Sequence, residues 1–383
     1  MKRIALAALL TTATATSALA AGLDRSGQSV LAIFDESNTG SVSVAHVNPS
    51  VSGTDTSGSG TTSYDTNESY TQVFASYANE INDTLSYAVI IDQPYGINLN
   101  YGGAPTADYF GGTKAELTST ALTVLLKHAF NEQFSAFGGI RAQEIDGDIS
   151  LNGVGYSTTL GGIVAAAGAG GASDFQNNGG YRAKYDPSWG TGVVVGAAYE
   201  VPEIALRAVL TYSNEITHNT NVTETSGANT VGSATGSFQT PQSINFDFQT
   251  GINETTLLLA SVRWTDWDDF ALTPPTLGNN LASISSEFRY SVGAAKRFTD
   301  ELVGLATIIY EKDGGKASGS ALGPSDGLIG LSLGARYSSG NMNISGGVGY
   351  TKIGDAVAAT GPFEALFTNN SAVSFGLKVQ YEF

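Results

Sequence analysis

The last eleven residues of the chain alternate strictly between apolar and polar or small side chains. The apolar positions are Val373, Phe375, Leu377, Val379, Tyr381 and Phe383. Successive side chains of a strand point to opposite faces, so this stretch predicts a strand with one apolar and one polar face. Its length suits a tilted strand crossing a bilayer, which takes about 9–11 residues. We interpret it as the closing strand of an outer-membrane β-barrel.

The first twenty residues have the three parts of a secretory signal peptide. Lys2 and Arg3 supply the charge, residues 4–10 are apolar, and Ala18-Leu19-Ala20 provides a small-x-small cleavage site. The alternative, an N-terminal membrane anchor, needs a much longer apolar run. We therefore expect export with cleavage after residue 20, so that the mature chain begins at Ala21.

The charge of the chain limits its partners. Without Lys2 and Arg3, the mature chain has 16 basic and 35 acidic residues, a net charge of −19. Binding to nucleic acid depends on Lys and Arg, so we expect no nucleic-acid partner. The chain has no cysteine, so an exported fold of this size must be stabilised by backbone pairing rather than by disulfides.

Short and long polar connections separate the alternating segments. The short ones lie near residues 79–83, 131–133, 201–203, 251–254, 299–301 and 339–341. The long ones lie near residues 55–66, 98–114, 147–187, 217–237, 267–283, 312–325 and 354–369. Six short and seven long connections join fourteen strands, an even number with both ends on the periplasmic side, as in bacterial barrels. A secreted soluble β-sandwich or β-helix is the main alternative, because periodicity alone does not exclude it.

The chain resembles the long-chain fatty acid transporters of the outer membrane (FadL type) over residues 21–383. The similar stretches are residues 40–53 (GSVSVAHVNPSVSG), 81–101 (INDTLSYAVIIDQPYGINLNY), 189–200 (WGTGVVVGAAYE) and 240–270. The resemblance implies a monomeric, fourteen-stranded antiparallel transmembrane barrel in the outer membrane of a Gram-negative bacterium. It divides the chain into a signal peptide (1–20), a short N-terminal hatch (21–40) and the barrel (41–383). The hatch lacks the family's Asn-Pro-Ala motif, so its gating role is in doubt.

Residues Asp92, Pro94, Tyr95 and Gly96 interrupt an otherwise regular strand. Proline cannot donate to a ladder, and glycine inside a strand marks a bulge or kink. One interpretation is a kink that leaves a gap in the wall, and the resemblance places a lateral opening here. The other is that Pro94 simply ends the strand at the outer rim.

Basic residues of the strands fall on the polar register. An Arg or Lys facing lipid at the bilayer midplane costs roughly 2–4 kcal/mol, so we expect these side chains to point into the lumen. They pair there with lumen carboxylates or hold a substrate carboxylate, and the resemblance favours Arg141 and Arg289 for the second role. Inward apolar residues either give the lumen an apolar ligand-binding wall or fill it as core; the candidates are Ile90, Phe137 and Leu259.

No catalytic or metal-binding motif stands out. His46, His128 and His218 are scattered, and no serine lies in a nucleophile-elbow pattern. Residues 264–269 (WTDWDD) fit an interfacial aromatic followed by a solvated loop better than a cation site. The loop 147–187 is either an apolar catchment for substrate or a Gly/Ala-rich lid. We expect no cofactor.

The expected function is uptake of hydrophobic compounds, fatty acids or aromatic hydrocarbons, with release into outer-membrane lipid through the wall. A general porin for small hydrophilic solutes is the alternative, and it requires an open polar lumen. An outer-membrane lipid hydrolase requires a nucleophile that the sequence does not show.

Overall fold

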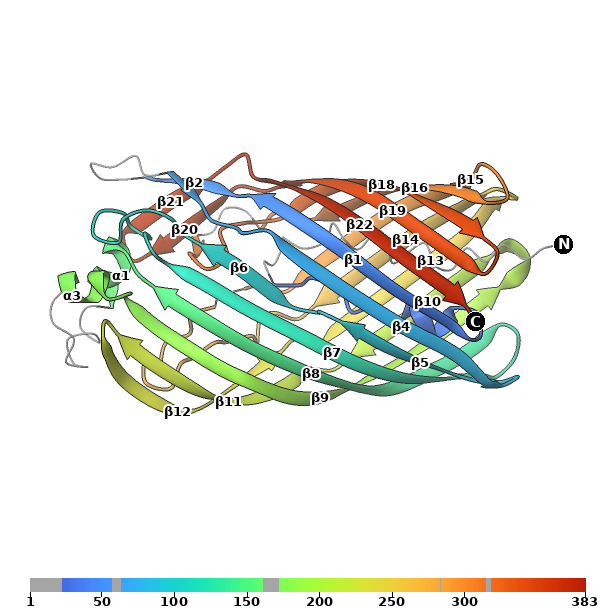
Figure 1. Ribbon diagram of the computed structural model, residues 1–383, viewed down its shortest axis with the longest axis horizontal. Helices are drawn as coiled ribbons and strands as arrows, with labels where there is room; N and C mark the ends of the chain where they lie inside the picture. Colours follow the sequence, from blue (N-terminus) through green and yellow to red (C-terminus); the bar gives the residue numbers. More distant parts are fainter. Residues whose placement is uncertain (1–22, 57–62, 161–171, 283, 315–317) are drawn as a thin grey trace.

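The structure is a computed structural model that describes residues 23–56, 63–160, 172–282, 284–314 and 318–383. The predicted signal peptide lies outside these residues. The described strands form a closed, antiparallel barrel (Figure 1). Its wall has fourteen strand positions, which we call staves, and a stave can consist of two consecutive strands. The first six staves are β1 (Thr39–Ser50), β4 (Tyr70–Asn82), β5 (Leu85–Asp92) with β6 (Gly96–Asn100), β7 (Lys114–Ala129), β8 (Phe134–Leu151) and β9 (Tyr181–Val201).

The remaining eight staves complete the circle. They are β10 (Leu206–Ser213) with β11 (Ile216–Ser226), β12 (Asn229–Thr240) with β13 (Ser243–Asn253), β14 (Thr256–Thr265), β15 (Glu287–Arg297), β16 (Leu302–Glu311), β18 (Leu328–Ser339), β19 (Met342–Ile353) and β22 (Ser371–Glu382). The barrel closes where β22 pairs with β1, from Thr39 opposite Glu382 to Ser50 opposite Ser371. The last stretch of the chain is therefore the closing strand, as its alternation predicts.

The alternation of β22 also fixes which side chains face outward. Val373, Phe375 and Leu377 are 52%, 58% and 50% exposed, whereas Ser374 and Lys378 are 3% and 2% exposed. In a barrel of the outer membrane, the exposed apolar face lies against lipid, and the polar face lies in the lumen. Four arginines of the other strands follow the same rule, since Arg141, Arg263, Arg289 and Arg336 are all buried.

The long connections form additional structure at one end of the barrel, which we call the loop end (left in Figure 1). A five-stranded sheet there is built from β17 (Ser318–Ser320), β20 (Ala356–Thr360), β21 (Phe363–Phe367), β2 (Ser52–Asp55) and β3 (Ser63–Asp65). Two short helices, α1 (Val154–Thr159) and α3 (Ala172–Asn177), lie in the longest connection. The opposite end carries the short turns, the 3-10 helix η3 (Pro202–Ile204) and the C-terminus.

Two predicted connections are corrected by the structure. Residues 217–237 are not a loop, because β11 and β12 continue the wall there as a paired hairpin from Ile216 opposite Thr240 to Ser226 opposite Asn229. Threonine and valine in this stretch favour strand, and their outward neighbours are polar because the hairpin extends beyond the apolar band. Residues 98–114 likewise contain the end of β6. None of the helices described is long and apolar enough to cross a membrane.

The N-terminal segment, residues 23–38, lies inside the barrel. Its 3-10 helix η2 (Leu31–Phe34) is fully buried and packs on inward residues of the wall. The Phe34 ring contacts the Phe137 ring edge-on at a centroid distance of 5.8 Å. Burying such apolar side chains contributes about 1.5–3 kcal/mol each. Ile90 and Phe137, expected to line a ligand site, belong to this packed cluster.

Candidate functional site

The wall of the barrel is interrupted between β4 and the kink that joins β5 to β6. The β4–β5 ladder ends at Ala75 opposite Ile91. Beyond it, an isolated bridge between Asn67 and Leu99 closes the wall again. On the other side the stave stays paired with β7, through Asp92 opposite Ala121 and Gly96 opposite Thr118. Pro94 therefore kinks the strand rather than ending it at the rim.

Side chains on both faces of the wall line this interruption, which we call the wall gap. Its volume is about 450 Å³, and its lining includes Arg25, His46, Tyr70, Thr71, Gln93, Tyr95, Asn98 and Ser119. Thr71 is exposed on the outer face and bonds the ring of His46 at 3.0 Å, whereas Arg25, Tyr70 and Tyr95 are buried on the inner face. The lining of the wall gap therefore includes side chains from both faces of the wall.

Side chains replace some of the backbone pairing that the kink removes. The Val73 amide donates to the side-chain carbonyl of Gln93 at 2.9 Å. The Tyr95 amide donates to Oγ of Ser119, which in turn donates to the Tyr95 carbonyl, at 2.8 and 2.7 Å. A barrel must satisfy its backbone internally because lipid offers no hydrogen bonds. The kink is therefore a supported feature of the wall.

The N-terminal segment crosses the inner side of the kink and pairs with it. The Arg25 amide donates to the Pro94 carbonyl at 2.8 Å, and the Gly96 amide donates to the Leu23 carbonyl at 2.9 Å. Asp92, predicted to border the opening, instead accepts a hydrogen bond from Ser26 inside the barrel. The break in the wall and the N-terminal segment are thus held together.

The guanidinium of Arg25 stands across the inner mouth of the wall gap. It donates to Oδ1 of Asn98 at 2.9 Å, and its Cζ lies 4.0 Å from the centroid of the Tyr70 ring. A Cβ at position 96 would lie 2.5 Å from that Cζ. A side chain at position 96 would therefore displace the Arg25 guanidinium from its present place. No local pattern indicates a role for Arg25, because its position depends on the fold of the segment before the first strand.

Asp24 anchors the N-terminal segment to the opposite wall. Its carboxylate accepts from Nε of Arg263 at 2.6 Å and lies 3.7 Å from Nη1 of Arg289. Arg289 also pairs with the buried Glu311. Burial raises the pKa of Asp24, but the charges of Arg263 and Arg289 outweigh it, so the pKa lies below its ordinary value. Asp24 is therefore ionised at neutral pH.

The two arginines predicted to hold a substrate carboxylate have partners within the protein. Arg289 pairs with Glu311 and Asp24, and with Leu259 it borders a small cavity of about 90 Å³ beneath Ser26 and Leu31. Arg141 donates to Oγ1 of Thr123 at 2.9 Å and to Oγ of Ser213 at 3.3 Å. A ligand role for either arginine stays a prediction.

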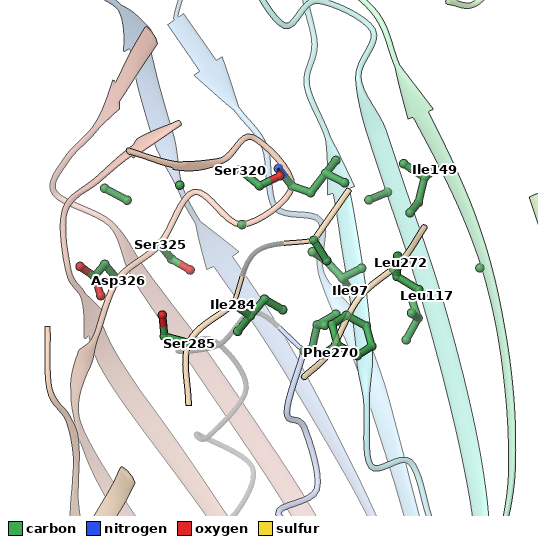
Figure 2. Close-up of a pocket in the computed structure, with 18 of the residues that line it drawn as sticks. Ile97, Leu117, Ile149, Phe270, Leu272, Ile284, Ser285, Ser320, Ser325 and Asp326 are labelled. Atoms are coloured by element: carbon green, nitrogen blue, oxygen red, sulfur yellow. Dashed lines mark hydrogen bonds between the residues drawn. The ribbon is translucent and has the colours of Figure 1, made fainter. Parts of the chain in front are cut away.

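A cavity of about 330 Å³ lies toward the loop end, and we call it the loop-side cavity. One wall is apolar and combines inward residues of the barrel with the connection between β14 and β15 (Figure 2). These residues are Ile97, Leu117, Ile149, Phe270, Leu272 and Ile284. The connection enters the barrel because its apolar side chains are buried there. Trp267, expected at the start of a solvated loop, is 1% exposed and packs on Tyr95 and Phe270.

The loop-side cavity and the wall gap lie next to each other, because residues adjacent or nearly adjacent in sequence line the two spaces. Leu23, Ile97 and Leu117 line the cavity, whereas Arg25, Asn98 and Thr118 line the gap. The cavity size is at the lower end of small-molecule sites, which have volumes of about 300–1,000 Å³. The arrangement can hold a small apolar molecule directly beside the wall gap.

Comparisons with known proteins agree with this architecture. A sequence model of a family described as outer membrane protein transport protein (OMPP1/FadL/TodX) matches residues 12–383. No curated protein matches the chain by sequence. Among solved structures, the chain is similar to a Pseudomonas aeruginosa FadL homologue, with 16% identity, a TM-score of 0.72 and coverage of 97% of this chain and 98% of that chain.

Two toluene transporters have the same fold. The transporter TodX of Pseudomonas putida has 12% identity and a TM-score of 0.65, covering 97% of this chain and 94% of its own. The transporter TbuX of Ralstonia pickettii has 12% identity and a TM-score of 0.60, with 97% and 98% covered. At these identities the structures establish the shared fold.

Proposed function

Because the chain belongs to the outer membrane protein transport family (OMPP1/FadL/TodX), a Gram-negative outer-membrane family, we propose that it takes up hydrophobic compounds and releases them sideways through the wall gap. The observation that carries the proposal is the bounded break in the β4–β5 ladder directly beside the loop-side cavity. A hydrophobic compound in the cavity would pass the Leu23–Arg25 segment, enter the gap and reach the bilayer.

The chemistry of the two faces supports a lateral route. Around the gap, the outer wall carries exposed apolar side chains such as Val42, Val73 and Leu122, which are suited to lipid. Apolar compounds dissolve in that bilayer, so release into it avoids the transfer to water that opposes passage into the periplasm. We propose that the protein works as a monomer without catalysis, with outer-membrane lipid as its surroundings.

The N-terminal segment is proposed to act as the hatch. It fills the lumen with the packed residues of η2 and fixes its start through Asp24. A general porin needs an open, water-filled lumen, and the buried cluster around Phe34 and Phe137 opposes that function. The segment reaches both the kink and the opposite wall.

Single-channel recording in planar bilayers separates the hydrophobic-compound channel from the porin. We expect the purified protein to insert with near-silent traces, because the buried η2 cluster blocks the path for hydrated ions. A parallel measurement of uptake of an apolar fluorescent compound should show transport by the same preparation. A large, steady current from the unaltered protein would favour the porin and contradict the proposal.

A further inference from the structure

The loop-side cavity has a polar wall opposite its apolar wall. Ser285, Ser320, Ser325 and Asp326 come from the connections before β15 and before β18 (Figure 2). Glu287, at the start of β15, also lines the cavity. Serine hydroxyls both donate and accept hydrogen bonds, while ionised carboxylates only accept. The cavity therefore presents apolar surface on one side and hydrogen-bonding groups on the other.

The charges at this cavity are unfavourable for an anion. Asp326 and Glu287 lie on its inner lining, and no arginine is among the described residues that line it. Lys312 is the single basic residue there, and its side chain is exposed to solvent. Glu116 and Asp146 also border the cavity, but Glu116 shares the outward register of Leu122 and Val124.

The buried arginines nearby are already neutralised by carboxylates of the protein. Glu287 interacts electrostatically with Arg289, Glu311, Asp24 and Arg263. Three carboxyl groups therefore surround two guanidinium groups, so the buried arginines already have acidic partners within the protein. A carboxylate ligand would lose its hydration without gaining a free cation, which is strongly unfavourable.

We propose that the loop-side cavity selects hydrophobic molecules with an uncharged hydrogen-bonding head, such as an alcohol or phenol, and rejects fatty-acid anions. This inference rests on the proposed function, because it assigns the substrate class of the same cavity. The apolar body packs on Ile97, Leu117 and Phe270. The hydroxyl donates to the carboxylate of Asp326 and accepts from a serine.

Competition binding in lipid nanodiscs tests the head group while the chain length stays constant. An apolar fluorescent probe is displaced by decan-1-ol, by its methyl ether and by decanoate at neutral pH, where decanoate is ionised. We expect decanoate to bind at least about tenfold more weakly than the alcohol, equal to about 1.4 kcal/mol. The ether, which accepts but does not donate, should fall between them.

Variants locate the effect in the cavity. Asp326→Asn should narrow the difference in affinity between decan-1-ol and decanoate, because the amide removes a negative charge and can donate a hydrogen bond. The control Asp300→Asn makes the same chemical change on an exposed turn at the opposite end of the barrel, and should leave the difference unchanged.

Three results would overturn the inference. Decanoate binding as tightly as decan-1-ol would show that the cavity accepts anions, and loss of that binding in Lys312→Gln would identify the cation responsible. An equal effect of Asp326→Asn and Asp300→Asn would show that total charge, not the cavity, discriminates. If none of the three compounds displaces the probe while uptake of other hydrophobic compounds persists, the cavity is not the substrate site, although transport itself stands.

Discussion

Replacing Asp24 by alanine should convert a near-silent barrel into one that conducts ions. The change removes the carboxylate that pairs with Arg263 at 2.6 Å and faces Arg289 at 3.7 Å. Breaking a buried ion pair by removing one partner costs about 3–5 kcal/mol. If that loss falls on docking of the N-terminal segment, the undocked population rises roughly hundred- to thousandfold. Planar-bilayer recording should then show frequent open events.

Glu36→Ala is the matched control for this variant. It removes a carboxylate from the same segment, but Glu36 is exposed, so its traces should stay as quiet as those of the unaltered protein. Both variants should keep the heat-modifiable gel mobility of a folded barrel. Silent traces from a folded Asp24→Ala protein would contradict a hatch held by this ion pair.

The pH dependence of conductance should follow the same ion pair. The pKa of Asp24 lies below its ordinary value because Arg263 and Arg289 favour the ionised form. The stabilisation that ionised Asp24 gives to the docked N-terminal segment is therefore fully present above pH 3.8. It is lost only as the pH falls through the lowered pKa of Asp24. We expect unchanged, quiet traces from neutral pH to about pH 5.

Arg25→Ala should increase the rate at which hydrophobic compounds leave through the wall. The guanidinium crosses the inner mouth of the gap between Asn98 and Tyr70. Alanine keeps the main-chain bond to Pro94 but removes the group that narrows the passage. We expect a several-fold higher initial rate of uptake of an apolar fluorescent compound, with little change in conductance, since Asp24 still fixes the segment.

Arg182→Ala provides the control for loss of one positive charge. Arg182 is exposed and pairs with Asp148 on the wall, away from the residues that line the gap. Its uptake rate should equal that of the unaltered protein. An Arg25→Ala protein with an unchanged rate would show that this side chain does not limit passage.

Much of the wall was predictable from the sequence because a strand in a lipid-facing barrel has a strict period of two. Val373 and Phe375 face outward, Ser374 and Lys378 face inward, and β22 closes on β1 as that pattern indicates. The kink at Pro94 was also visible, since proline removes a ladder donor. The family resemblance rested on the order of such segments.

The interior was harder to predict because no short-range pattern determines which connections fold inward. Phe270 and Leu272 were assigned to an outer loop, yet they form the apolar wall of the loop-side cavity. Arg25 precedes every strand and reaches the gap only through pairing of its segment with the kink. Apolar residues in a connection are a signal that could have indicated the inward position of Phe270 and Leu272. The second requires the three-dimensional fold.

Reversible blockade of the wall gap tests lateral release most directly. The chain has no cysteine, so Thr71→Cys places a single thiol on the outer rim of the gap, and Val373→Cys places one on the lipid-facing surface of β22. Each protein is labelled in detergent with a bulky methanethiosulfonate, reconstituted, and assayed for transfer of an apolar fluorescent compound before and after reduction. We predict that labelling at position 71 stops transfer, that reduction restores it, and that labelling at position 373 has no effect. Undiminished transfer by the fully labelled Thr71→Cys protein would contradict passage through the wall.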